Sequence, residues 1–235
     1  MSFRRGNVGM EGSVIKERID AEKKEFLNRL FSSFLFILVV ALLFWVPYRV
    51  FSVLCWGTYA LMIYEIFSPK IKKKKMLLRT VAALFCFGGI YSFTYCREFF
   101  GQLGCVFLIC VASFTDIGAY SFGKVLRGPK LCPKISPNKT WAGFWGGILF
   151  ANIAIFCLNN TFFANERAFL HLMDFWTVQL IILASIMGDL LESWFKRSIG
   201  VKDMGDLFPG HGGILDRLDS LLLASIVLAI IDKLF

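Results

Sequence analysis

The sequence predicts an all-α integral membrane protein, a polytopic helical bundle of about seven transmembrane helices with its N-terminus in the cytoplasm. Its 235 residues are 57% hydrophobic and 16% aromatic, whereas soluble domains are about 45–50% apolar. Seven apolar segments each come close to the roughly 20 residues that an α-helix needs to cross a bilayer. Most of the 26 Lys and Arg residues fall before the first span or between alternate spans, as expected of cytoplasmic segments.

Three regions follow from this pattern. Residues 1–25 carry charges of both signs and are expected to form a cytoplasmic or interfacial N-terminal segment. Residues 26–115 hold the N-terminal transmembrane helices, and residues 116–235 form the transmembrane region whose cytoplasmic face carries the chemistry. The spans are expected at residues 26–46, 48–67, 76–95, 99–120, 141–158, 175–195 and 215–235.

The composition argues against several classes of protein. A net charge of +9 does not indicate a nucleic-acid-binding protein here, because the basic residues stand in short clusters between apolar runs. Such clusters set topology and favour anionic lipid headgroups and nucleotides. The seven cysteines lack any CxxC or Cys/His ligand spacing, so they are interpreted as small buried hydrophobic residues rather than zinc ligands or disulfides. The polar first 25 residues do not resemble a cleavable signal peptide.

One stretch, residues 188–219, breaks the apolar pattern. Charged groups at the edge of hydrocarbon are costly unless they are paired, hydrated or bound to a metal. This stretch nevertheless holds six carboxylates: Asp189, Glu192, Asp203, Asp206, Asp216 and Asp219. It is therefore the first candidate for a functional site.

Helical spacing brings these carboxylates together. Asp189, Glu192 and Ser193 share one face of the sixth span, and Asp216 and Asp219 share a face at the start of the seventh. Carboxylates that two helices bring to one depth repel each other without a metal, and they form a hard-oxygen site suited to Mg²⁺.

The glycines and basic residues of the same stretch suit a polyphosphate ligand. Glycine lets the backbone approach a phosphate closely, and four glycines lie between the two helices: Gly205, Gly210, Gly212 and Gly213. Four cations can neutralise the phosphates: Lys196, Arg197, Lys202 and Arg217. Ordinary salt bridges among these charges are the alternative interpretation.

A second polar region joins the fourth and fifth spans. Asp116, near the end of the fourth span, either has a functional partner or caps and hydrates the helix end. Residues 123–140 combine turn-forming glycines and prolines with Lys124, Arg127, Lys130, Lys134 and Lys139. This combination predicts a phosphate cradle, with a basic loop that only sets topology as the alternative. The GxxxG spacing of Gly143 and Gly147 predicts close helix packing.

From Ser193 to Asp219 the chain reads SWFKRSIGVKDMGDLFPGHGGILDRLD. This run resembles, at every fixed position, the signature of the phosphatidate cytidylyltransferases, also called CDP-diacylglycerol synthases. The upstream runs DIGAYSFGK and SPNKTWAG are similar to the same family, so the resemblance covers residues 116–235. Ala142 departs from it, since the family often has a glutamate there, and the chain is short for the family.

The resemblance implies a nucleotidyltransferase that moves the cytidylyl group of CTP to phosphatidic acid, giving CDP-diacylglycerol and pyrophosphate for phospholipid biosynthesis. It implies Mg²⁺, with room for a second, monovalent cation. The implied metal ligands are Asp189, Asp216, Asp219 and Asp116. The implied catalytic residues are Asp189, Asp216, Lys196 and His211. The implied substrate-binding residues are Lys124, Ser136, Lys139, Ser193, Arg197, Lys202, Asp203, Gly212, Gly213 and Arg217.

The expected partners are CTP, phosphatidic acid, the lipid bilayer and a second copy of the chain. The expected location is a bacterial inner membrane, with the active site facing the cytoplasm. Two other classes remain open: a CTP-dependent polyprenol kinase or related lipid nucleotidyltransferase, and a transporter with intramembrane carboxylates. A transporter predicts charges near the midplane of several helices, whereas here they crowd the last third of the chain.

Overall fold

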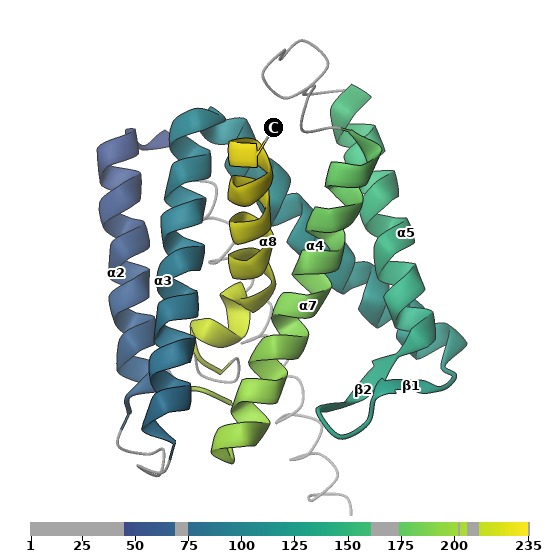
Figure 1. The fold of residues 1–235 in the computed structure, drawn as a ribbon. Coiled ribbons are helices and arrows are strands. Elements are labelled where there is room, and N and C mark those ends of the chain that lie inside the picture. Colours follow the sequence, from purple (N-terminus) through teal and green to yellow (C-terminus); the bar gives the residue numbers. More distant parts are fainter. Residues whose placement is uncertain (1–44, 69–74, 161–173, 202, 206–211, 235) are drawn as a thin grey trace, which may run out of the picture.

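The computed structural model describes residues 45–68, 75–160, 174–201, 203–205 and 212–234 (Figure 1). Within these residues six helices run up and down in turn. They are α2 (Tyr48–Ile66), α3 (Met76–Phe99), α4 (Gly101–Leu126), α5 (Trp141–Leu158), α7 (Phe175–Ile199) and α8 (Leu215–Leu234). The predicted N-terminal segment and almost all of the first predicted span lie outside the described residues.

The prediction of a helical membrane protein is confirmed. Among the described residues, four helices are long and apolar enough to cross a membrane, namely α3, α4, α5 and α7. Helices α2 and α8 coincide with predicted spans but are not among these four, and α8 carries charged residues in its first and last turns. The count of seven spans and the cytoplasmic N-terminus stay predictions.

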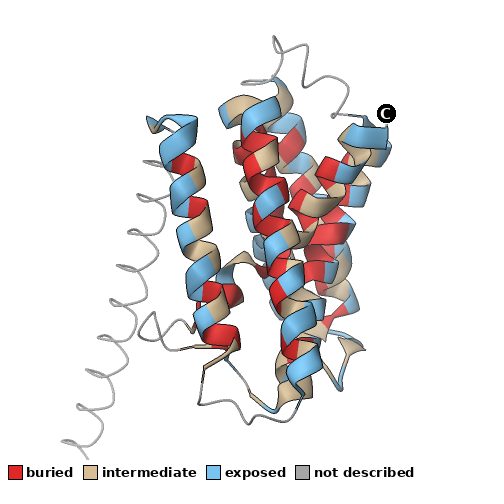
Figure 2. Cartoon of the chain, turned by 60° about the vertical axis from the view of Figure 1, so that its left-hand side comes forward, coloured by how far each residue is buried: buried red, intermediate tan, exposed pale blue. Residues whose placement is uncertain are grey.

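Residues coloured as buried lie mainly where the helices face one another, and residues coloured as exposed lie mainly on their outer faces (Figure 2). Many exposed residues are large and apolar, for example Leu77, Leu84 and Phe156. An apolar surface on long apolar helices is what a bilayer requires, because lipid replaces water as the solvent.

Glycines set the closest helix contacts. A Cβ atom at Gly118 of α4 would lie 2.6 Å from the carbonyl oxygen of Gly146, and one at Gly143 of α5 would lie 2.6 Å from that of Ala119. The predicted close packing at the GxxxG spacing is therefore confirmed, between α4 and α5. At Gly188 of α7 a Cβ atom would lie 2.5 Å from the carbonyl oxygen of Asp219. The backbones of α7 and α8 thus nearly touch beside two of the predicted site residues.

The connection between α4 and α5 differs from the predicted loop. Helix α4 continues to Leu126, so Lys124 lies on a helix, and an antiparallel hairpin follows, made of β1 (Lys130–Cys132) and β2 (Ser136–Thr140). The helix ends because Arg127 and Gly128 both have positive φ, 56° and 103°, and Pro129 disfavours helical backbone in the residue before it. Thr140 then starts α5, since its side-chain oxygen accepts a hydrogen bond from the amide of Gly143. The all-α prediction is wrong in this detail.

Candidate functional site

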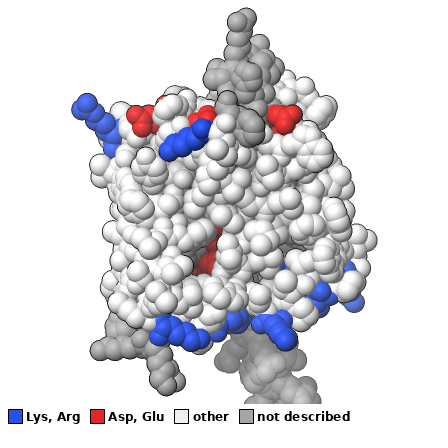
Figure 3. All heavy atoms as spheres, in the orientation of Figure 1, with Lys and Arg blue, Asp and Glu red and all other residues white. Residues whose placement is uncertain are grey.

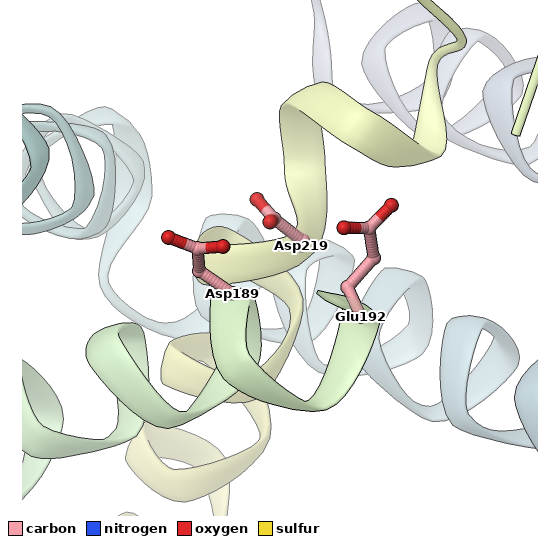
Figure 4. A group of neighbouring side chains, drawn as sticks. All are labelled: Asp189, Glu192 and Asp219. Carbon is pink, nitrogen blue, oxygen red and sulfur yellow. The ribbon is translucent and has the colours of Figure 1, made fainter. Parts of the chain in front are cut away.

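Three carboxylates meet where α7 and α8 touch. Asp189 and Glu192 of α7 and Asp219 of α8 each offer an oxygen within 4.8 Å of the others (Figure 4). Glu192 and Asp219 are only 5% and 8% exposed. The near-contact at Gly188 explains the meeting, because it brings the first turns of α8 against the helix that carries the other two carboxylates.

The donor set of this carboxylate group fits a hard divalent cation. Three carboxylates at this separation repel one another unless protons or cations intervene. Within the part of the chain that the structure describes, Oε1 of Glu192 is buried without a hydrogen-bond partner. Mg²⁺ is bound in proteins by carboxylate oxygens of this kind, together with water and phosphate oxygens.

Two lysines reach the carboxylate group from different elements. Nζ of Lys139, on β2, lies 2.5 Å from Oδ2 of Asp189. Nζ of Lys196, one turn beyond Glu192 on α7, lies 2.6 Å from Oε2 of Glu192 and 2.9 Å from Oδ1 of Asp216. The site therefore offers ammonium groups beside carboxylates, which is a suitable environment for phosphate oxygens.

Asp216 is placed beside this group rather than within it. Its Oδ2 accepts hydrogen bonds from the amides of Met204 and Gly213, at 3.1 and 2.8 Å, while its Oδ1 contacts Lys196. Asp216 thus holds the chain before α8 in place. The role of Asp216 as a main metal ligand stays a prediction. The third member of the carboxylate group is instead Glu192, which helical spacing places on the same face of α7 as Asp189.

Asp116 of α4 borders the group from another side. Its carboxylate interacts electrostatically with Asp189, Lys139 and Asp219. A residue that the sequence placed at the end of a different span therefore lies within reach of the same charges. This position agrees with a supporting role at a metal site.

The hairpin is fastened to the end of α7 by a second basic residue. Nε of Arg197 donates a hydrogen bond to the carbonyl oxygen of Ile135, in the hairpin turn, at 3.4 Å. Oγ of Ser193 donates to Oδ1 of Asp189 at 3.4 Å. The predicted cradle and the predicted carboxylate site are thus parts of one site.

The remaining predicted residues are less closely placed. Lys124 is exposed and donates to the hydroxyl of Tyr120 at 3.3 Å. Ser136 is half-buried in the hairpin, Asp203 and Arg217 are exposed, and Gly212 has a positive φ of 79°. Lys202 and His211 lie outside the described residues, so their predicted roles stay predictions.

Glu65 of α2 is a structural determinant of the site that sequence analysis missed. It is 2% exposed and accepts hydrogen bonds from the amides of Ile214 and Leu215, at 2.9 and 3.1 Å. These amides stand at the start of α8, where unpaired N–H groups favour a negative charge. A Cβ atom at Gly205 or Gly213 would lie 2.6 Å from a Glu65 oxygen. The signal available in the sequence was a lone carboxylate in the last turn of an apolar helix.

Charge is unevenly distributed over the surface. Figure 3 shows basic side chains along the end that carries the hairpin, side chains of both signs at the opposite end, and acidic atoms deep in a hollow of the uncharged region between them. The carboxylate group lies toward the same basic end, because Lys139 of the hairpin (Figure 1) contacts Asp189.

Comparison with known proteins places these features in a family. A family model described as "Cytidylyltransferase family" matches residues 16–235. A phosphatidate cytidylyltransferase of Brucella suis biovar 1 (strain 1330) is 44% identical over 142 residues, which are 59% of this chain and 50% of the relative. One of Mycobacterium leprae (strain TN) is 40% identical over 134 residues, 57% of this chain and 41% of the relative. The chain spans about half the length of the curated relatives that it matches.

Proposed function

The chain belongs to the cytidylyltransferase family, and on this premise we propose that it transfers the cytidylyl group of CTP to phosphatidic acid, giving CDP-diacylglycerol and pyrophosphate. The similar proteins of Brucella and Mycobacterium carry the name phosphatidate cytidylyltransferase. The observation that carries the proposal is the meeting of Asp189, Glu192 and Asp219 with Lys139 and Lys196 inside an apolar bundle. Such a site suits a reaction between a nucleotide and a membrane lipid.

In the proposed reaction a phosphate oxygen of phosphatidic acid attacks the α-phosphorus of CTP. The new P–O bond forms as the bond from the α-phosphorus to the bridging oxygen breaks, and pyrophosphate leaves with that electron pair. The attacking oxygen is already anionic, so the reaction needs no strong general base. The main obstacle is repulsion between two polyanions, which fixed cations and in-line positioning reduce.

Lys139 and Lys196 are the described cations best placed for this task. They reach the carboxylate group from the hairpin and from α7, so phosphate groups between them meet positive charge from two sides. Arg197 holds the hairpin against α7, which keeps Lys139 near Asp189. We assign His211 the role of donor to the triphosphate or acid for the leaving group, as the sequence predicts.

We propose Mg²⁺ as the metal, held by Asp189, Glu192 and Asp219, with Asp216 and Asp116 in support. When bound, it supplies charge neutralisation for phosphate oxygens and helps to orient them. A second, monovalent cation is part of the same proposal, since the five carboxylates exceed by one the positive charges of Mg²⁺, Lys139 and Lys196 together.

We further propose seven spans, with the N-terminus and the active site at the cytoplasmic face of a bacterial inner membrane. The basic end in Figure 3 supports this orientation, because cytoplasmic segments carry an excess of Lys and Arg. The same end carries the hairpin and the chain that precedes α8.

The test is transfer of label from α-labelled CTP into chloroform-soluble product by detergent-purified protein with phosphatidic acid and Mg²⁺. Wild type is compared with Asp189→Asn and with Asp232→Asn. Asp232 lies at the opposite end of α8, where it accepts a hydrogen bond from Tyr95 at 2.7 Å. We expect label in lipid from wild type and Asp232→Asn and almost none from Asp189→Asn. Transfer of γ-label to a lipid alcohol, without α-label, would instead establish the kinase alternative.

A further inference from the structure

An apolar groove of about 230 Å³ lies between α3 and α7, and the first residue of α8 also lines it. Its walls include Ala82 and Phe85 of α3, Leu191 and Trp194 of α7, and Leu215. Glu192 is the one acidic side chain among its described lining residues.

Glu192 connects this groove to the candidate active site. It lines the groove and also belongs to the carboxylate group with Asp189 and Asp219. Its side chain is 3% exposed, and Lys196 contacts it at 2.6 Å. The lining of the groove is therefore apolar apart from Glu192, and at Glu192 the groove adjoins the charges that suit a phosphate.

The position of the groove restricts its occupant. Both walls are helices long and apolar enough to cross a membrane, and the neighbouring Leu77 and Leu84 are 80% and 65% exposed. Ordered water is not expected in a groove with these walls, because a buried water molecule needs several polar partners. An extended peptide would leave backbone polar groups unsatisfied at membrane depth, and a helix, about 10–12 Å across with its side chains, is too wide for a groove of this volume. A flexible hydrocarbon chain is narrow, needs no polar partner and has no backbone polar groups to satisfy.

We propose that this groove holds an acyl chain of the phosphate-bearing lipid substrate and so places the lipid phosphate beside the carboxylate group. The proposal rests on the proposed function. Moving an acyl chain from lipid into an apolar groove gains little from the hydrophobic effect, because both surroundings are apolar. The groove therefore acts through shape: it fixes where the headgroup lies, and it discriminates between chains by fit.

Filling the groove tests the proposal. Ala82→Trp places a large side chain in the wall, and Val81→Trp, at a more exposed lining position, is a milder second variant. Leu84→Trp on the same helix is the matched control, because Leu84 is 65% exposed and does not line the groove. Initial rates are measured in mixed micelles with dioleoyl and dihexanoyl phosphatidic acid, at saturating and limiting CTP.

We expect both groove variants to lower the rate with the dioleoyl lipid, Ala82→Trp by about tenfold, because the indole takes up space that the acyl chain would occupy. The rate with the dihexanoyl lipid and the KM for CTP should change by less than about twofold. A short acyl chain does not fill the groove, and sites that share no contacts affect each other little. Equal losses with both lipids, or the same loss in Leu84→Trp, would overturn the proposal.

A binding experiment separates this inference from the reaction itself. A phosphatidic acid with a photoreactive diazirine on one acyl chain is crosslinked to wild type and to inactive Asp189→Asn protein, and the labelled peptides are mapped. We expect label on α3 and α7 in both proteins and its loss in Ala82→Trp. Label elsewhere in both proteins refutes the groove. Label on α3 and α7 without any α-label transfer keeps the groove but refutes the proposed reaction.

Discussion

Lys196 lies between two carboxylates from different helices, Glu192 of α7 and Asp216 of α8, and all three side chains are largely buried. Replacing it with methionine keeps the apolar stem and removes the charge. We expect Lys196→Met to lower kcat/KM for α-label transfer by about 10²–10³-fold, the usual cost of losing one preorganised electrostatic contact to a transition state. The control is Lys233→Met at the opposite end of α8, where the ammonium lies over the ring of Tyr95. A similar loss in both variants would contradict a role specific to the site.

Glu65 accepts two backbone hydrogen bonds at the start of α8, one with each carboxylate oxygen. Glutamine cannot replace it without loss, because only one of its two terminal atoms is an acceptor. In Glu65→Gln the amide nitrogen is a donor, so at least one of the amides of Ile214 and Leu215 loses its acceptor. We expect a loss of about 1–3 kcal/mol of stability, the cost of leaving a buried polar group unsatisfied, measured by thermal unfolding in detergent. Glu98→Gln at the exposed end of α3 should have almost no effect. An unchanged unfolding temperature in Glu65→Gln would contradict this role.

The sequence predicts the contacts on α7 well and the contact of Glu65 not at all. Helical spacing alone places Glu192 and Lys196, or Asp189 and Ser193, on neighbouring turns, and both pairs are in contact. Glu65 and Ile214 are 149 residues apart in the chain. Their contact depends on how α2 and α8 pack, which no local pattern encodes.

Helix α7 meets α8 through a backbone contact at Gly188 that also sets the separation of the carboxylates. An added Cβ atom would lie 2.5 Å from the carbonyl oxygen of Asp219 and 3.1 Å from Cα of Ser220, so the helices would have to separate. We expect Gly188→Ala to reduce α-label transfer by at least about tenfold, since small displacements of reacting groups are costly, and to raise the Mg²⁺ concentration needed for activity.

Gly57→Ala is the matched control for this helix contact. Gly57 lies inside α2, and a Cβ atom there meets nothing within 4 Å. Alanine is favoured over glycine in a helix by about 1 kcal/mol, so activity should be retained and stability unchanged or raised. Full activity in Gly188→Ala would show that the site does not depend on the close contact.

At the level of elements, the apolar segments of the sequence predict the positions of the helices better than they predict the residues at which the helices end. Helices α2, α5 and α8 match predicted spans closely, but α3, α4 and α7 continue past the predicted ends at residues 95, 120 and 195, to Phe99, Leu126 and Ile199. A helix can extend beyond the hydrocarbon, because water there satisfies its polar side chains. The hairpin was missed because β1 has only three residues, too few to show the alternation typical of a strand.

For the whole molecule, the balance of charge at the carboxylate group is the central physical problem. Asp189, Glu192 and Asp219 bring three carboxylates together, and Asp116 and Asp216 stand beside them. Lys139 and Lys196 are the basic residues that contact them in the described part of the chain. When all five carboxylates are ionised, two ammonium groups leave net negative charge inside an apolar bundle, which further cations would neutralise.

Mg²⁺ should therefore stabilise the folded protein even without nucleotide or lipid. A ligand that binds only the folded state adds about 2.7 kcal/mol at a concentration 100-fold above its Kd. We expect Mg²⁺ to raise the thermal unfolding temperature of wild type and Asp232→Asn protein, and the rise to be much smaller in Asp189→Asn. Titration with MgCl₂ at constant ionic strength, with choline chloride as the balancing salt, separates specific binding from screening. Equal rises in unfolding temperature in all three proteins would show that any effect of Mg²⁺ does not depend on Asp189. The negative charge of the carboxylate group would then have to be neutralised by protons or by groups of the substrate.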